Sequence, residues 1–183
     1  MQSLRSLVRQ LEPLYAEIDQ AVALYAQRSA LACPPGCGVC CHSPNIEVTL
    51  LDALPLACSL VDEGEGETLL RALEDHPQPH CPLFLHHGAG QGRCRRYAHR
   101  PSLCRLFGFA GRPNKHGLVT LAVCRVHKEK QTPIPTHPAP PSFTAFGHRL
   151  AAIHPAYGTT LLPIHEALRQ ALEKVLLARQ LHP

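Results

Sequence analysis

The sequence predicts a small, mainly α-helical fold with short strands and irregular cysteine-rich loops, of the α+β class. Long amphipathic patterns occupy both ends of the chain, whereas the middle is interrupted by many of the 18 prolines and carries most of the nine cysteines. A chain of 183 residues is long enough to bury a core within one domain. Because aromatic residues are few and Trp is absent, we expect that core to consist of Leu, Ala and Val.

The N-terminal segment is predicted to be a helix over residues 3–30. Its apolar residues recur at intervals of three and four, and Ser3 is placed to cap the first turn. Pro13 lacks the backbone N–H that a helix interior needs, so it is expected to kink this helix or divide it in two. The helical pattern ends where the Cys33-Pro34-Pro35-Gly36 run begins.

A second helical region follows the first cysteines. Residues 46–48 read as a short extended piece, and residues 49–52 resemble a capping box in which Asp52 replaces the usual Glu. The helix that begins there is expected to end near Gly64. A further short helix over residues 67–74 is stopped by the prolines at 77 and 79.

The middle of the chain favours short strands. Residues 81–85 read as a strand, residues 86–92 as a flexible turn and residues 93–97 as the returning strand. Residues 100–105 fit a single helical turn with Pro101 at its first position. Residues 118–126 alternate well enough to form a strand that carries Cys124.

The C-terminal part contains a proline-rich connection and a helix. Five prolines between residues 131 and 142 predict an extended surface connection. The last helix should run from about Pro163 to Gln180 and pack on the N-terminal helix. We therefore expect one domain, 1–183, comprising a helical segment (1–30), a cysteine-rich core (31–126), a Pro-rich connection (127–144) and a second helical segment (145–183).

Charge and N-terminal composition indicate the compartment. The net charge is +4, and the stretch from Arg93 to Lys130 is strongly basic. Arg5 and Arg9 interrupt what would have to be the apolar part of a secretory signal, and no run is long enough to span a bilayer. We expect a cytoplasmic protein without a membrane partner, in which the thiols stay reduced. A secreted disulfide framework is the alternative, and the odd number of cysteines argues against it.

The cysteines predict a metal site. Cys58 lies on an apolar helical face, where a free thiol is usually a small buried hydrophobe. The other cysteines stand beside Gly, Pro and Arg on predicted turns, where thiolates suit a soft or borderline metal. We therefore expect helices packed around a cysteine-ligated metal centre. The candidate ligands are Cys33, Cys37, Cys40, Cys41, Cys81, Cys94, Cys104 and Cys124.

The spacing of the cysteines is compatible with both an iron–sulfur cluster and zinc. The gaps of three and two residues in Cys33, Cys37 and Cys40 also occur in radical S-adenosylmethionine enzymes, which hold a [4Fe–4S] cluster by three thiolates, although the rest of that fold is missing here. The Cys37–Cys40 pair alone has the spacing of a zinc knuckle. We favour an iron–sulfur cluster of the [4Fe–4S] type over Zn. Because successive side chains on extended backbone point apart, Cys40 and Cys41 should serve two metals, or only one of them should ligate.

Nearby basic residues have several possible roles. His42 is a candidate extra ligand, although a surface role is favoured for it, as it is for His80, His86, His87 and His99. The arginines are placed to donate hydrogen bonds to sulfur and to balance thiolate charge. A nucleic-acid surface is less favoured, because few aromatic side chains could stack on bases. The arginines concerned are Arg93, Arg95, Arg96, Arg100 and Arg105.

The joint pattern resembles a known family. It resembles the bacterial cysteine-cluster proteins named for their CxxCxxCC motif, over roughly residues 30–126. The resemblance implies binding of zinc or iron, often as an iron–sulfur cluster, and a cytoplasmic location. The first gap, between Cys33 and Cys37, is three residues here, whereas the family name implies two. Cys33 therefore does not stand at the spacing of the family motif. The matching residues are Cys33, Cys37, Cys40, Cys41, the run Cys81-Pro82-Leu83-Phe84-Leu85, Gly92-Arg93-Cys94, Tyr97, Arg100-Pro101 and Cys104-Arg105.

Three functions are compatible with these residues. The first is a metal- or cluster-binding protein that acts in electron transfer, metal handling or maturation of a partner protein. The second is an enzyme that uses an open iron or a free thiol, with Cys40 or Cys41 as the candidate residue. The third is a structural zinc module whose Arg-rich face binds RNA or an acidic protein.

Overall fold

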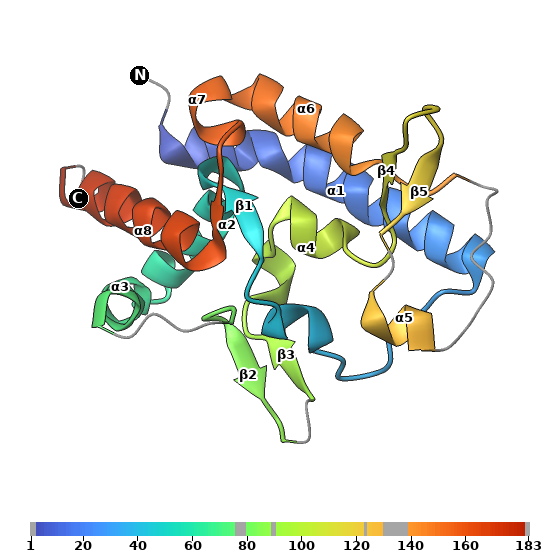
Figure 1. Ribbon diagram of the computed structural model, residues 1–183. Coiled ribbons are helices and arrows are strands. Elements are labelled where there is room, and N and C mark those ends of the chain that lie inside the picture. Colours follow the sequence, from blue (N-terminus) through green and yellow to red (C-terminus); the bar gives the residue numbers. More distant parts are fainter. Residues whose placement is uncertain (1–2, 76–79, 89–90, 123, 130–138, 182–183) are drawn as a thin grey trace.

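A computed structural model describes residues 3–75, 80–88, 91–122, 124–129 and 139–181. Its described part is mostly helical, with six short strands in three two-stranded sheets (Figure 1). The helices are α1 (Leu4–Ser29), α2 (Leu50–Asp62), α3 (Gly66–Asp75), α4 (Ser102–Leu106), α5 (Arg125–Glu129), α6 (Phe143–Ile153), α7 (Pro155–Gly158) and α8 (Ile164–Leu181), with single 3-10 turns η1 (Val39–His42) and η2 (Tyr97–His99). The strands are β1 (Glu47–Thr49), β2 (Phe84–His86), β3 (Gly92–Cys94), β4 (Gly111–Pro113), β5 (Val119–Leu121) and β6 (Leu161–Pro163).

The core is built around α2. Every residue of this helix from Leu50 to Val61 is buried, and its side chains contact α8 and α3 as well as α1. The main partners of α8 are α2 and α3, whereas α1 packs against α4, α6 and α2. The expected packing of the C-terminal helix on the N-terminal helix is therefore wrong, because the apolar sides of both helices are covered by other elements. The helices surround Leu and Ala side chains of α2, so the cysteine-rich segments lie beside the core and not at its centre.

Helix α1 is continuous over 26 residues. Ser3 caps it as predicted, and its Oγ accepts a hydrogen bond from the backbone N–H of Ser6 at 3.2 Å. Pro13 lies within the helix on its exposed side, and the predicted division into two helices does not occur. Pro13 removes one hydrogen bond to the carbonyl of Arg9, and water can satisfy that carbonyl because Arg9 is also exposed.

Asp52 ties the start of α2 to two other helices. Thr49 caps α2 as predicted, since its Oγ1 accepts a hydrogen bond from the Asp52 N–H at 3.1 Å. The Asp52 carboxylate makes no return bond to Thr49, so the predicted capping box is only half formed. It accepts instead from the Tyr15 hydroxyl of α1 at 2.7 Å, and from the Ser102 hydroxyl and N–H at the start of α4. This carboxylate joins α1, α2 and α4.

The short strands were predicted in part. The hairpin of β2 and β3 is present, although β2 begins at Phe84 and not at residue 81. The predicted strand over residues 118–126 is limited to β5, which pairs with β4; Cys124 lies outside it, and helix α5 begins at Arg125. Pro101, the predicted first helical residue, is the N-cap of α4, and the helix begins one position later at Ser102.

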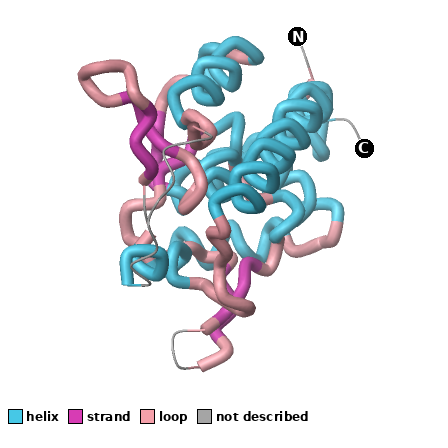
Figure 2. Tube along the Cα trace, turned by 90° about the vertical axis from the view of Figure 1, so that its right-hand side faces the viewer, coloured by secondary structure: helices cyan, strands magenta, loops and turns pink. Residues whose placement is uncertain are grey.

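The remaining differences lie toward the C-terminus. Helix α8 begins at Ile164, close to the predicted start, but α6, α7 and β6 were not predicted. Strand β6 pairs antiparallel with β1 and so brings a distant segment to the start of α2. Most of the expected Pro-rich connection, residues 130–138, lies outside the described residues. Figure 2 shows the helices gathered together, with strand hairpins at the edge of the molecule. No helix in the described part is both long and apolar enough to cross a bilayer.

The Asp52 junction gives a testable prediction. Replacing Tyr15 by Phe removes a donor from a buried carboxylate and should lower the free energy of unfolding by about 1.5–3 kcal/mol, measured by urea denaturation. Tyr25 is the matched control, because its buried hydroxyl has no hydrogen-bond partner. The Tyr25→Phe variant should be as stable as the wild type or slightly more stable. Equal losses in the two variants would contradict the assigned role of Asp52.

Candidate metal centre

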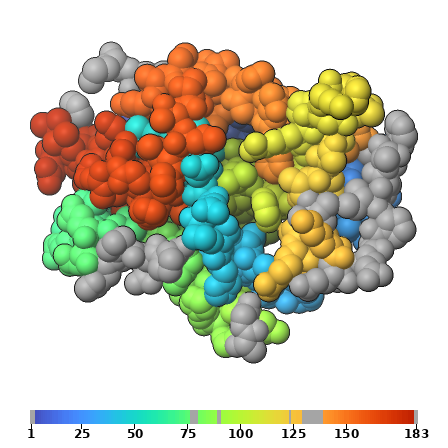
Figure 3. Space-filling model, viewed as in Figure 1, coloured from blue at the N-terminus to red at the C-terminus, as the bar shows by residue number. Residues whose placement is uncertain are grey.

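Four segments of the chain bring five thiols together. They come from η1 (Cys40, Cys41), the loop before β2 (Cys81), β3 (Cys94) and α4 (Cys104). The Cys81 N–H donates a hydrogen bond to the Cys41 carbonyl at 3.1 Å, which joins two of these segments directly. These five cysteines are free thiols, so no disulfide competes for them. Figure 3 shows the segment that runs from the first cysteines into β1 as a blue to cyan strip on the surface, between α8 and α5.

The thiols act on one another electrostatically. Burial raises the pKa of Cys104 well above its usual range, and thiolates at Cys81, Cys40 and Cys94 would raise it further. Burial likewise raises the pKa of Cys81 to about 11, opposed by a hydrogen bond from the Leu83 N–H, with added repulsion from Cys94 and Cys40. Because the interaction of two charges falls with distance, these mutual effects place the sulfurs in one small region.

Cys40 and Cys41 differ strongly although they are adjacent. A hydrogen bond from the Cys41 thiol, together with backbone N–H groups and the charge of Arg100, lowers the pKa of Cys40 to about 7 against the effect of burial. The same hydrogen bond and burial raise the pKa of Cys41. The expectation that these side chains point apart assumed extended backbone. That assumption is wrong, because residues 39–42 form a 3-10 turn in which neighbouring side chains can meet.

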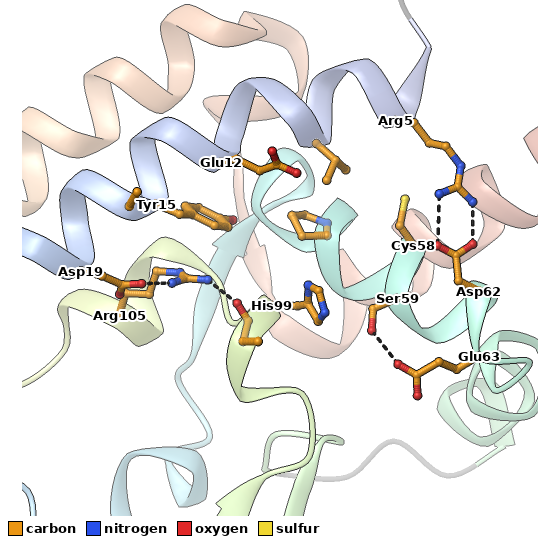
Figure 4. A pocket seen from close by; sticks show the side chains of 14 residues that line it. Arg5, Glu12, Tyr15, Asp19, Cys58, Ser59, Asp62, Glu63, His99 and Arg105 are labelled. Atoms are coloured by element: carbon orange, nitrogen blue, oxygen red, sulfur yellow. Dashed lines mark hydrogen bonds and ion pairs between the residues drawn. The ribbon is translucent and has the colours of Figure 1, made fainter.

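Arg105 anchors the segment that carries Cys104. Its side chain is buried, its Nε donates to the Arg100 carbonyl at 2.9 Å, and its Nη2 donates to the Ala98 carbonyl at 2.6 Å. The guanidinium also forms an ion pair with Asp19 and lies 4.3 Å from the centre of the Tyr15 ring (Figure 4). Arg105 thereby ties residues 98–105, including Cys104, to α1.

The hairpin that carries Cys94 is fixed by close backbone contacts. A Cβ at Gly38 would lie 2.1 Å from the Phe84 ring, and one at Gly92 would lie 2.2 Å from the Leu85 carbonyl oxygen. Only glycine therefore allows the turn after Cys37 to pack against β2 and β3. The Gly92 N–H donates to the Gly36 carbonyl at 3.1 Å, which closes this contact.

The arginines near the thiols are paired mainly with carboxylates. Arg96 forms ion pairs with Glu63 at 2.6 Å and Glu65 at 2.7 Å, and Arg95 pairs with Glu65 at 3.1 Å. Arg100 and Arg105 both pair with Asp19. Within the described residues, none of these four guanidinium groups donates a hydrogen bond to sulfur, contrary to expectation, whereas the backbone N–H of Arg96 donates to Cys94. Their effect is at longer range, since the charge of Arg100 lowers the pKa of Cys40 and opposes the rise that burial causes in Cys94.

The other four cysteines differ in their burial and contacts. Cys58 is buried on α2 as predicted. Cys33 is exposed, and Cys37 is half-buried with its backbone paired to Gln91. Cys124 accepts a hydrogen bond from the His127 N–H at 3.4 Å. Among the described residues the buried His127 ring has no hydrogen-bond partner at either nitrogen, which makes it a ligand candidate that we did not predict. The Cys-x-x-His spacing was the available signal.

Comparison with protein families agrees with this geometry. A family model named CxxCxxCC, described as a putative zinc- or iron-chelating domain, matches residues 32–148. The match spans well over half of the chain. The chain belongs to the CxxCxxCC family. No curated protein and no solved structure matched it.

The family match extends beyond the cysteines. It covers all four segments that carry the grouped thiols and continues through α5 into α6, past the end of the resemblance seen in the sequence. Chelation of zinc or iron is the property by which this family is described. The N-terminal helix α1 and the C-terminal helix α8 lie outside the match, although α1 supplies Asp19 and Tyr15 to the anchor of α4.

The five grouped thiols are donors of the type that zinc and iron prefer. Buried thiols with raised pKa values stay neutral at pH 7, and a bound cation removes their protons by offsetting the charge. As the side chains stand, no three His, Cys, Asp or Glu residues in the described part already surround one point as metal ligands. Small side-chain rotations are therefore needed to complete a site on this fixed backbone.

The lowered pKa of Cys40 predicts a reactive thiol in the metal-free protein. Its alkylation by iodoacetamide should rise with pH through about 7, because the thiolate is the reacting form. In the Cys41→Ala variant the pKa should move up toward the usual value, so alkylation of Cys40 at pH 7 should slow by about fivefold to tenfold. Mass spectrometry of the peptide measures both rates. The Cys58→Ala variant should leave the profile unchanged, and an unaltered profile in Cys41→Ala would refute the hydrogen bond.

Proposed function

We propose that this protein binds one zinc or iron centre through Cys81, Cys94, Cys104 and the Cys40–Cys41 pair, and that it handles this metal for exchange with a partner. The observation that carries the proposal is the grouping of five thiols from four segments in one electrostatic environment. Thiolates are preferred ligands of zinc and of iron–sulfur clusters, and four of them are sufficient for either.

The fold supports the proposal because it fixes the thiols without a metal. Cys104 follows the anchor formed by Arg105 and Asp19, and Cys94 lies on a hairpin that glycine contacts hold in place. Bringing uncharged thiols together before the metal arrives reduces the entropy lost on binding. A bound cation would supply the positive charge that allows all of these thiols to ionise.

The type of metal centre is left to experiment. The sequence preference for a [4Fe–4S] cluster rested on Cys33, Cys37 and Cys40, of which only Cys40 is in the grouped set. That set suits a single zinc or iron ion as well as a cluster. Participation of Cys33, Cys37 and Cys124 stays a prediction, as does the cytoplasmic location.

The exposure and lowered pKa of Cys40 favour metal handling over a purely structural role. This thiol is exposed, and its pKa is lowered to about 7, so about half of it is thiolate at neutral pH. An exposed thiolate ligand can be displaced by a thiol of a partner protein, which is how metals pass between cysteine sites. A structural zinc site is usually closed with all its ligands buried.

Metal analysis of two matched variants tests the proposal. After anaerobic purification, wild-type protein should contain about one metal centre per chain, either as zinc or as iron with acid-labile sulfide. Cys104→Ser should lose most of this metal, because it removes a grouped ligand. Cys58→Ser is the control and should keep the metal, since Cys58 is outside the group. Equal metal in all three proteins, or none in the wild type, would overturn the proposal.

A second candidate is a thiol-dependent enzyme with Cys40 as nucleophile, which the same exposure and lowered pKa favour. It differs from metal handling in one respect: Cys40→Ser would keep the metal while removing an activity. An RNA-binding role receives less support, because Arg95, Arg96, Arg100 and Arg105 are paired with carboxylates of the same chain.

A further inference from the structure

Three histidines lie together outside the thiol group. His42 ends η1, His80 precedes Cys81, and His86 ends β2. Their ring centres are separated by 4.9 Å (His42–His86), 5.3 Å (His80–His86) and 6.2 Å (His42–His80). They come from three separate places in the sequence, so no local motif predicts their meeting.

Two of these histidines are next in sequence to cysteines of the thiol group. The hydrogen bond from the Cys81 N–H to the Cys41 carbonyl holds residues 41 and 81 side by side. Cys81 is buried and Cys41 half-buried, and both pack against the apolar core. The residues next to them in sequence, His42 and His80, are exposed and half-buried respectively. At this junction each histidine is therefore more exposed than the cysteine next to it.

The spacing of the rings suits one metal ion. With metal–nitrogen bonds of 2.0–2.1 Å, three imidazoles on a tetrahedral ion have ring centres about 5 Å apart. Two of the three observed separations are close to this value, and the third exceeds it by about an ångström. The ring nitrogens do not yet point at a common centre. His42 and His86 are exposed, so their rings have room on the solvent side to turn.

The surroundings favour an ion over a plain aromatic cluster. The ring of Phe84 contacts those of His42 and His86 edge-on, with centres 4.6 and 4.4 Å apart, and so keeps both near the third ring. No hydrogen bond or ion pair occupies the imidazole nitrogens of His42, His80 or His86 within the described residues. Three imidazoles gathered without such partners retain free lone pairs, which are the donors that borderline divalent cations prefer.

We propose that His42, His80 and His86 form a second, solvent-facing site for a divalent cation of the zinc class. It is separate from the thiol centre and uses nitrogen ligands only. The site exchanges its ion with solvent because two of its three ligands are exposed. Its position on the outer side of the Cys41–Cys81 junction makes it an entry point for metal that approaches the thiols.

Equilibrium dialysis against buffered free Zn²⁺ tests this site in the full-length, reduced protein. The variant with His42→Gln, His80→Gln and His86→Gln should bind about one equivalent less than the wild type. His87→Gln is the matched control, because His87 is an exposed neighbour of His86 that makes no ring contact with the group, and it should bind as the wild type does. The number of thiols protected from a thiol reagent should be the same in all three proteins.

Further variants separate this proposal from the thiol centre. In Cys104→Ser the histidine-dependent equivalent should remain even when the thiol-bound metal is lost. The single change His86→Gln should weaken the extra equivalent by at least tenfold, and circular dichroism should show an unaltered fold. Equal zinc binding by the wild type and the triple variant would overturn the second site. Loss of thiol protection in the triple variant would overturn its independence, since the imidazoles would then belong to the thiol centre.

Discussion

The structure depends on a carboxylate buried where three helices meet. Asp52 sits in the first turn of α2 and accepts hydrogen bonds from Tyr15 of α1 and from the N-terminal residue of α4. Burial raises the pKa of Asp52, and the hydrogen bonds from Ser102 and Tyr15 oppose this rise. A short helix such as α4 has few apolar contacts of its own, so this carboxylate and the ion pair of Arg105 with Asp19 fix its position. The placement of Cys104 follows from them.

Five thiols lie around α4, and their thiolate forms repel one another. Burial and like charge raise the pKa of most of them, and Cys40 alone has its pKa lowered, by its neighbour Cys41. Such an arrangement has no evident value for packing, because an apolar core would be built more simply from Leu and Ala. It becomes favourable when a cation balances the charge, which is the property that membership of a zinc- or iron-chelating family describes. The arginines nearby are mostly paired with acidic residues and contribute mainly to holding the hairpin.

Local sequence patterns were sufficient for the long helices and insufficient for the contacts between distant segments. Apolar spacing and capping residues located α1, α2 and α8 because these signals are contained within each helix. The pairing of β1 with β6 and the packing of α8 on α2 join residues far apart, so no local pattern specifies them. In the site, cysteine spacing identified the candidates, but it did not show which of them the fold brings together. The 3-10 turn at Cys40 and the meeting of His42 with His86 likewise arise from tertiary structure.

The central claim is that sulfurs from separate segments bind one metal centre. X-ray absorption at the zinc or iron edge of the metal-loaded protein measures this most directly, because it reports which elements surround the ion and at what distance. We predict a shell dominated by sulfur at about 2.3 Å, with a reduced sulfur contribution in any metal retained by Cys104→Ser. A shell made of oxygen and nitrogen in the wild-type protein would contradict the account.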